Sequence, residues 1–175
     1  MLATKFLTEC DFGQYRHWLE SRDPDTLSMY FGVSVSKFFI DATINKILSK
    51  PENHYFLVAT DGDRWVGVIH MAQISEQHME FGVMVDEEYR GQGIANQLMQ
   101  EAIIWARNRG YSHLYMHCLT WNRPIRHLCE KHGLEIKNFT DGKEVESRIK
   151  LPPRSLTSIG QEYAINNRNL YRMIL

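Results

Sequence analysis

The N-terminal third of the chain combines one short apolar run with two stretches of helical periodicity. Residues 2–8 are short and mostly apolar, which predicts a strand. Apolar residues then recur three and four positions apart over 11–21, as on one face of a helix, and the polar run 21–25 with its proline ends the pattern. A second helical stripe over 38–48 stops before the next proline. We therefore expect a strand followed by two helices.

In the middle of the chain the period changes to that of strands. Runs rich in apolar and β-branched residues over 54–60, 65–73 and 79–85 predict three strands. The turn sequence Asp61-Gly62-Asp63 joins the first two as a hairpin, and the polar residues 75–77 join the second and third. Three strands joined this closely form an antiparallel meander.

A long helix then interrupts the strands and returns the chain to the same sheet. Apolar residues from Ile94 to Ala106 lie along one helical face, and Gly110 stands where a glycine often ends a helix. The run 114–119 is again strand-like. A strand, a helix and a strand in this order form a right-handed crossover, so the strands 79–85 and 114–119 should run parallel.

The remaining elements complete the sheet. Asn122 can cap a short helix over 123–132, and 134–139 and 144–151 are two further strands across a turn at Asp141-Gly142. The predicted fold class is therefore α+β (mixed α/β). We expect a mixed, mostly antiparallel central sheet with helices on both faces and one βαβ crossover.

Residues 152–175 follow this domain, placed at 1–151, as a C-terminal helical extension. The run Ser158-Ile159-Gly160-Gln161 has the spacing of a capping box, which predicts a helix over 157–174. Four apolar residues share one face of this helix: Ile159, Tyr163, Leu170 and Ile174. The helix either folds back on its own sheet or packs on a second copy. Because the extension is net basic, which does not suit burial of its other face, we favour a homodimer.

Composition narrows the class of protein. The chain has 175 residues, of which 43% are hydrophobic and 23% charged, and these values exclude a disordered or fibrous protein. Twenty Lys and Arg against 21 Asp and Glu give a net charge of −1, so no charge excess favours nucleic acid or an anionic membrane as a partner. No apolar stretch approaches the ~18 residues of a membrane-spanning helix.

Cysteine and histidine usage indicates a reducing compartment and no metal site. The cysteines, Cys10, Cys118 and Cys129, are odd in number and form no CxxC pair. We therefore expect a cytoplasmic protein without a disulfide framework. The eight histidines form neither HExxH nor HxxEH, so we expect no metal.

The segment between the third strand of the meander and the long helix carries the candidate chemistry. It contains Arg90-Gly91-Gln92-Gly93, and the helix begins at once. Glycines let the backbone approach a ligand closely, and the free N–H groups of a first helical turn carry the positive end of the helix dipole. The segment therefore predicts an anion site suited to a phosphate or pyrophosphate.

Two common nucleotide-binding motifs do not fit this loop. The P-loop sequence GxxxxGK[ST] is absent. The dinucleotide fingerprint GxGxxG needs a third glycine where Asn96 stands and an acidic strand end where Tyr115 stands. On the glycines alone, a tight turn that binds no ligand is an equally good interpretation.

Two runs together resemble the GCN5-related N-acetyltransferase (GNAT) superfamily. Arg90-x-x-Gly93-x-Ala95 matches its motif [Q/R]-x-x-G-x-[G/A] between a strand and a helix. The run from Asn122 to Leu134, NRPIRHLCEKHGL, is similar to the family's N-x-x-A-x-x-L-Y-E-K-x-G-F segment. Both runs lie on the expected elements and cover the central part of the chain, so the sequence is identified as a member of this superfamily.

The resemblance implies acetyl-CoA as the cosubstrate. Its pyrophosphate would lie on the amides of the glycine loop, and its pantetheine along the end of the strand 79–85, where the parallel strands diverge. In this family Asn122 typically faces the pantetheine, although it can equally be a plain helix cap. The residues so assigned are Val83, Met84, Val85, Arg90, Gly91, Gln92, Gly93, Ile94, Ala95, Asn96 and Asn122.

Acetyl transfer to an amine needs a base, and two residues compete for that role. Glu80 lies on the strand before the motif, where many members of the superfamily carry a carboxylate. His117 lies five residues before Asn122, where the ribosomal-protein N-terminal acetyltransferases carry a glutamate, and imidazole suits a base near neutral pH. Either residue can instead be structural. By resemblance, a backbone N–H near Val83–Val85 would stabilise the oxyanion.

The sequence departs from the family at the proton donor. The usual tyrosine, seven residues after the asparagine, is replaced by Cys129. A thiol can donate a proton, but it is shorter than tyrosine and a weaker hydrogen-bond donor. Cys129 is therefore either a catalytic acid or a small buried filler of the core, and we favour the filler.

The expected activity is acetyl-CoA-dependent N-acetylation of a primary amine by direct attack in a ternary complex. The acceptor is either a small molecule, such as a polyamine, amino acid or antibiotic, or a protein lysine or N-terminus. Its pocket would be built by the helices over 11–50 and the strands near 139–151, which carry no motif. The alternative is a non-catalytic module that binds acetyl-CoA as a sensor, which the missing tyrosine supports.

Overall fold

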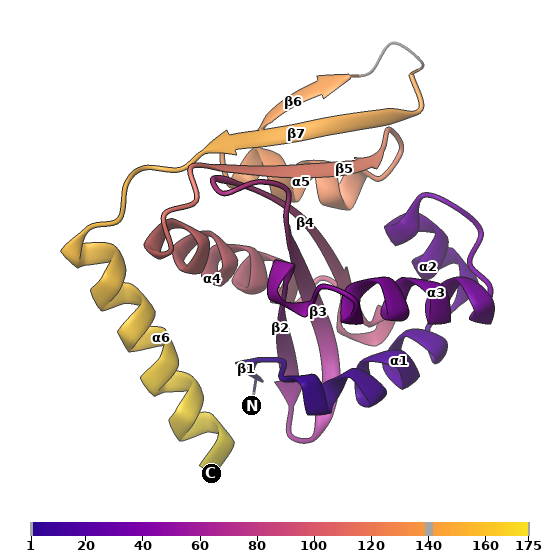
Figure 1. The fold of residues 1–175 in the computed structure, drawn as a ribbon, viewed down its shortest axis with the longest axis horizontal. Helices are drawn as coiled ribbons and strands as arrows, with labels where there is room; N and C mark the ends of the chain where they lie inside the picture. Colours follow the sequence, from indigo (N-terminus) through magenta and orange to yellow (C-terminus); the bar gives the residue numbers. More distant parts are fainter. Residues whose placement is uncertain (1, 139–141, 175) are drawn as a thin grey trace.

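The strands of the chain form a seven-stranded sheet in the computed structural model, which describes residues 2–138 and 142–174 (Figure 1). Their order is β1-β2-β3-β4-β5-β7-β6, and all neighbours are antiparallel except β4 and β5. The strands are β1 (Leu2–Phe6), β2 (His54–Asp61), β3 (Arg64–Gln73), β4 (His78–Val85), β5 (His113–Leu119), β6 (Glu135–Asn138) and β7 (Glu144–Lys150). The predicted mixed, mostly antiparallel sheet is confirmed.

Helices cover both faces of the sheet because alternate strand residues turn apolar side chains to opposite sides. Phe56 and Val68 pack with apolar residues of α1 and α3, whereas Leu57 and Ile69 pack with those of α4 (Figure 1). The helices are α1 (Phe12–Glu20), α2 (Pro24–Phe31), α3 (Lys37–Leu48), α4 (Ile94–Asn108), α5 (Arg123–Lys131) and α6 (Leu156–Ile174). Single 3-10 turns lie at 9–11, 51–53 and 87–89.

The sequence analysis missed one helix, α2. The run 21–25 does end α1, but Pro24 is also the first residue of α2. The side chain of Asp23 accepts a hydrogen bond from Thr26 N at 2.7 Å, and Gly32 ends the helix with a φ of 73°. Proline at the first position and glycine after the last are favourable at helix ends, so a segment expected to be a loop folds as a helix.

The other predicted elements begin and end within two residues of the observed bounds. Phe139 and Asp141, which were assigned to a strand end and a turn, lie outside the described residues. The cap of α6 differs from its prediction. Ser155 N donates to Ser158 Oγ at 2.9 Å and Ser158 N to Ser155 Oγ at 3.2 Å, so the serine pair lies at the helix start and the helix begins at Leu156.

The parallel strands β4 and β5 stay paired over three residues only. Residues 78–80 pair with residues 113–115, as the crossover predicted. Beyond Glu80, β4 continues beside β3 up to Val85, and β5 continues beside β7 up to Leu119. The two strands therefore diverge toward their carboxyl ends.

Helix α6 covers the free edge of the sheet at β1, which has β2 on one side only (Figure 1). The side chain of Asn169 accepts a hydrogen bond from Thr4 N at 3.2 Å and donates to Thr4 Oγ1. The guanidinium of Arg172 donates to Leu2 O at 2.8 Å. These contacts occupy backbone groups that would otherwise be open to another strand.

Charged contacts hold the same face of α6 against α4. Arg168 pairs with Glu101 at 2.8 Å, and Glu162 pairs with Arg109 at 2.8 Å. The Glu101 side chain is only 6% exposed. The expectation that the basic face of the extension resists burial was therefore wrong, because carboxylates of the domain meet its arginines. Of the two alternatives, the structure shows the helix folded back on its own domain.

A pair of histidines lies among the aromatic side chains between the sheet and α1. His70 Nε2 lies 2.9 Å from His54 Nδ1, and the His70 ring stacks on Phe56 with 4.2 Å between ring centres. Burial, with a smaller contribution from the neighbouring His54, lowers the pKa of His70 to about 3. The imidazole is therefore neutral in the folded protein, whereas in the unfolded chain it titrates near ~6.5.

We expect stability to fall as the pH drops below about 6.5, because the unfolded chain then binds a proton that folded His70 excludes. Between about pH 7 and about pH 5 the loss due to His70 is about 2 kcal/mol. Urea denaturation at the two pH values should show a smaller loss for His70→Gln, whereas His17→Gln on the exposed face of α1 should behave like the unmodified protein. Equal pH dependence in all three proteins would contradict the assignment.

Candidate functional site

The glycine loop leads directly into the N-terminus of α4. Gly91 and Gly93 have φ values of 75° and 82°, in the left-handed region that favours glycine. Gly93 is the N-cap of α4, and the first helical bond runs from Gln97 N to Gly93 O at 3.0 Å. The N–H groups of residues 94–96 therefore point out of the helix end without a helical carbonyl partner.

The space in front of this loop is open. Apart from chain neighbours, no described atom lies within 4 Å of the point where a side chain would begin at Gly91 or Gly93. Arg90 and Lys131 line the cleft here, as do Asp25 and Glu87, so the backbone amides rather than the side-chain charges make this an anion site. Free amides, the helix dipole and open space together fit a phosphate or pyrophosphate.

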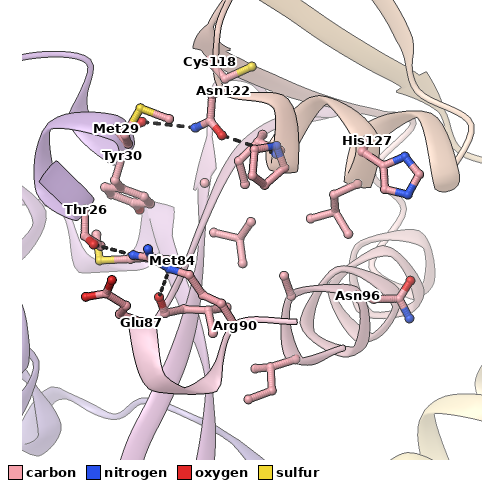
Figure 2. Close-up of a pocket in the computed structure, with 18 of the residues that line it drawn as sticks. Thr26, Met29, Tyr30, Met84, Glu87, Arg90, Asn96, Cys118, Asn122 and His127 are labelled. Atoms are coloured by element: carbon pink, nitrogen blue, oxygen red, sulfur yellow. Dashed lines mark hydrogen bonds between the residues drawn. The ribbon is translucent and has the colours of Figure 1, made fainter. Parts of the chain in front are cut away.

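A cleft of about 640 Å³ runs from the glycine loop to the gap between β4 and β5. Its walls come from β4, β5, α2, α4 and α5 (Figure 2). Residues 83–85 line it along β4, whose backbone has no β5 partner on this side beyond Glu80. The cleft brings together the residues assigned to the cofactor except Gln92, whose side chain donates to Glu88 O at 3.1 Å. A linear ligand anchored at the loop could pair with the exposed backbone of β4.

The side chain of Arg90 connects the loop to α2. Its Nη2 donates to Thr26 Oγ1 and its Nε donates to Val85 O at 3.4 Å (Figure 2). Thr26 in turn donates to the carboxylate of Asp23, the N-cap of α2. Arg90 therefore holds α2 against the start of the anion site, a role that the motif did not indicate.

Asn122 joins α5 to α2 across the cleft. Its Oδ1 accepts a hydrogen bond from Ile125 N at 3.4 Å, which caps α5, and its Nδ2 donates to Met29 O at 3.5 Å (Figure 2). The residue is 6% exposed and also lines the cleft. The helix cap is thus observed, and the same side chain lies where a ligand would pass.

The two candidate bases lie in contact with each other. His117 Nδ1 is 2.9 Å from Glu80 Oε1, and His117 Nε2 is 3.3 Å from Glu146 Oε2. Because β4, β5 and β7 are neighbours and side chains alternate along each strand, the three groups share one face of the sheet. His117 lines the cleft. Glu80 does not line it but contacts His117, which does. The result is an imidazole between two carboxylates, suited to accepting and holding a proton.

Cys129 lies in the hydrophobic core. Its side chain is fully buried, and Sγ is 3.4 Å from Met116 Sδ. Burial raises the pKa of this thiol, and the residue is absent from the cleft lining among the described side chains. This position matches the filler interpretation.

Tyr30 on α2 lies directly against β4 where the strands part. A side chain at Gly82 would meet the Tyr30 ring at 3.0 Å and its hydroxyl at 3.1 Å, so the glycine allows the ring to rest on the strand. Burial, with the nearby charge of Glu80, raises the pKa of Tyr30 above its usual range. The phenol thus stays protonated beside the cleft (Figure 2).

A buried ion network anchors the turn between β4 and the loop. Asp86 pairs with Arg22 at 2.7 Å and with Arg64 at 3.0 Å. Burial alone would raise the pKa of Asp86, but the hydrogen bonds from both arginines outweigh it and hold the pKa below the usual value. The turn that presents the glycine loop is thereby fixed to β3 and to the turn between α1 and α2.

Sequence reasoning missed three residues that help to build this site. Tyr30 and Thr26 were missed with their helix, although Asp23-Pro24 and Gly32 are recognisable helix-end signals. Glu146 was missed because it is one polar residue in an alternating strand, and only the strand order places it beside His117. No local sequence signal indicates that pairing.

The comparison with family models identifies the class of protein. Residues 13–134 match the model of the Acetyltransferase (GNAT) family, and this range contains the glycine loop, both candidate bases and the Asn122 run. The chain therefore belongs to the GNAT acetyltransferase family, whose members are acetyl-CoA-dependent N-acetyltransferases. No curated protein matches the sequence.

Solved structures show the same fold at low sequence identity. The GNAT domain of S. lividans PAT superposes with a TM-score of 0.73 at 16% identity, covering 85% of this chain and 89% of that one. Spermidine N-acetyltransferase from Vibrio cholerae, in complex with CoA and spermine, gives 0.67 at 18% identity, covering 85% and 95%. The ribosomal-protein-S18-alanine N-acetyltransferase from Escherichia coli gives 0.63 at 17% identity, covering 89% and 96%.

The described residues contain neither a membrane-spanning helix nor a cluster of metal-ligating side chains. No helix in 2–138 or 142–174 is long and apolar enough to cross a membrane. Within the same ranges, no group of three or more His, Cys, Asp or Glu side chains could hold a metal ion. The three cysteines are free thiols.

We expect Gly93→Val to weaken acetyl-CoA binding at least tenfold by calorimetry. A β-branched side chain is strained at positive φ and would fill the open space before the amides. Gly62→Val provides the matched control, because Gly62 also has a positive φ, of 59°, but lies at the β2–β3 hairpin away from the cleft. Unchanged affinity in a folded Gly93→Val protein would remove the anion-site assignment.

Proposed function

We propose that the protein transfers the acetyl group of acetyl-CoA to a primary amine by direct attack in a ternary complex. The observation that carries this proposal is the continuity of the cleft. One end holds the amides of the glycine loop, the middle exposes unpaired β4 backbone, and the far end holds His117 with its two carboxylates. This order matches a ligand with phosphates at one end and a reacting group at the other.

The cosubstrate supplies an acetyl group on a thioester carbonyl. The amides at 91–96 bind its pyrophosphate, and the backbone at 83–85 pairs with the pantetheine arm. A backbone N–H of the same β4 segment donates to the carbonyl oxygen as negative charge develops there. This chain thereby positions and polarises the group.

His117 removes the proton that makes the amine nucleophilic. Glu80 fixes Nδ1 at 2.9 Å, and an incoming amine would displace Glu146 from Nε2, because that contact is the longer of the two, at 3.3 Å. The freed nitrogen lone pair attacks the carbonyl carbon, and the carbon–sulfur bond breaks with its electron pair on sulfur. The two carboxylates stabilise the imidazolium that results.

Tyr30 supplies the proton that the leaving thiolate takes up. Tyr30 lines the cleft beside Gly82 of β4, where its hydroxyl can donate to a ligand. The phenolate that forms regains a proton from the His117 group, so the chain returns to its starting state. Tyr30 thus takes the role that the family assigns to the position of Cys129.

Direct attack is preferred over an acetyl-enzyme because the available thiols are poor nucleophiles. Cys118 lines the cleft, but burial raises its pKa to about 11. Thiolate rather than thiol attacks a carbonyl, so a thiol with this pKa is unreactive near neutral pH.

The acceptor that best fits the site is a cationic amine. Glu80 and Glu146 place two carboxylates beside the reacting end of the cleft. An ammonium group is attracted to such a pair before it is deprotonated. Polyamines and lysine side chains have this chemistry, and the Vibrio cholerae neighbour is a spermidine N-acetyltransferase.

CoA release from acetyl-CoA in the presence of an amine panel tests the proposal. The panel contains spermidine, free lysine, a lysine peptide and a peptide with an N-terminal alanine. We expect at least one primary amine to raise the rate well above hydrolysis. Tight acetyl-CoA binding without turnover on any amine would support the non-catalytic sensor instead.

We expect His117→Ala to lower kcat by ~10²–10⁴-fold with acetyl-CoA affinity unchanged. Glu80→Gln should lose less, because the imidazole remains. Glu135→Gln is the control, since Glu135 is an exposed carboxylate on β6 outside the cleft lining. A large loss in Glu80→Gln with full activity in His117→Ala would make Glu80 the base. Full activity in both would remove the direct-base mechanism.

We expect Tyr30→Phe to lower kcat by about tenfold or more. The loss can be smaller than is usual for a lost acid catalyst, because thiolate is a good leaving group. The ring still packs on Gly82, so KM for acetyl-CoA and the melting temperature should hold. The acidic limb of the pH–rate profile, which reports protonation of the base, should persist. The alkaline limb, which reports loss of the proton from the donor, should disappear. A variant with unchanged kcat would show that Tyr30 only packs against β4.

A further inference from the structure

Helix α6 is amphipathic, but it packs its polar face on the domain and exposes its apolar face. Its buried residues are polar, with Ser158 fully buried and Asn169 only 5% exposed. Its large apolar residues instead face solvent: Leu156, Ile159, Tyr163, Leu170 and Tyr171. We call these five residues the α6 strip. A surface helix normally buries its apolar face, so the strip indicates a surface that is covered by a partner.

The charged residues of α6 are all engaged by its own domain. Glu162 pairs with Arg109, Arg168 pairs with Glu101, and Arg172 donates to Leu2 O. The strip itself contains no charge. A membrane surface or an acidic partner would be met by basic residues beside the apolar side chains, and α6 turns its arginines the other way. An identical uncharged strip is complementary to it without electrostatic cost.

Two leucines of the strip are placed symmetrically about Tyr163. Leu156 and Leu170 each lie seven residues, or two helical turns, from it. A two-fold axis through Tyr163, perpendicular to the helix, would place Leu156 of one copy against Leu170 of the other on both sides. Such an isologous contact closes after two copies.

The area of the strip is near the lower limit for a specific interface. At their observed exposures, the five side chains present roughly 450 Å² per copy, about 900 Å² for two copies, on the usual side-chain areas. Specific interfaces begin at about 1,000 Å². Because this area is small, the pairing should be reversible.

We propose that the α6 strip is the interface of a homodimer in which the two α6 helices pack antiparallel and cross at Tyr163. The polar face of each helix stays on its own β1 edge, so the dimer forms without exchange of the helix between copies. Ile174, which the sequence analysis included in the apolar face, has a side chain outside the described residues.

Light scattering on the full chain over a range of concentrations tests the association. We expect a reversible monomer–dimer equilibrium that Tyr163→Glu shifts at least tenfold toward the monomer. Thr157→Glu places the same charge on an exposed position of α6 outside the strip and should leave the equilibrium unchanged. A monomer at every concentration, a larger assembly, or a dimer that Tyr163→Glu leaves intact would overturn the proposal.

Cysteine cross-linking tests the antiparallel geometry in a background with exposed Cys10 changed to Ser. Tyr163→Cys lies on the two-fold axis and should form a disulfide-linked dimer on mild oxidation. Leu156→Cys alone should form no disulfide-linked dimer. A mixture of the Leu156→Cys and Leu170→Cys proteins should form one. Cross-linking of Leu156→Cys to itself would indicate parallel helices and overturn this geometry. These measurements use no acetyl-transfer assay, so their outcome is independent of the proposed activity.

Discussion

Backbone hydrogen bonding between β4 and β5 stops at Glu80 and Tyr115, and the cleft exists because it stops there. Each strand is held on its outer side, by β3 or by β7, so the two can part without losing all of their partners. The parting leaves unpaired backbone on β4, which a ligand can use. It also brings Glu80 to the last paired position, where His117 on the diverging strand can still reach it at 2.9 Å.

Helix α2 closes this opening by contacts with three separate elements. Arg90 reaches Thr26 from the glycine loop, Asn122 reaches Met29 from α5, and Tyr30 rests on Gly82 of β4. Each contact depends on a residue that few others could replace. These are the guanidinium of Arg90, the short amide of Asn122 and Gly82, which has no side chain. The anion site, the strand gap and the proton-transfer groups are thereby held in one arrangement.

The sequence was sufficient for most of the fold and for locating the glycine loop that we propose as the anion site. Strand and helix periods, the crossover rule and the loop from Arg90 to Gly93 are local signals, and the family match supports them. Contacts across the sheet are not local. Nothing near Glu146 indicates that β7 rather than β6 lies beside β5, so its approach to His117 depends on strand order. Helix α2 was missed because its short apolar pattern is weak and its proline was interpreted only as a terminator.

The contacts of α6 on β1 join the two ends of the chain. Thr4 and Asn169 are 165 positions apart, and Leu2 and Arg172 are 170 apart. Because synthesis proceeds from the N-terminus, the first strand is made long before the helix that covers its edge. The β1 edge of the nascent protein therefore stays open until α6, which is made much later, can cover it. A ribosome that stops short of α6 would release a chain whose edge strand is free to pair with another molecule.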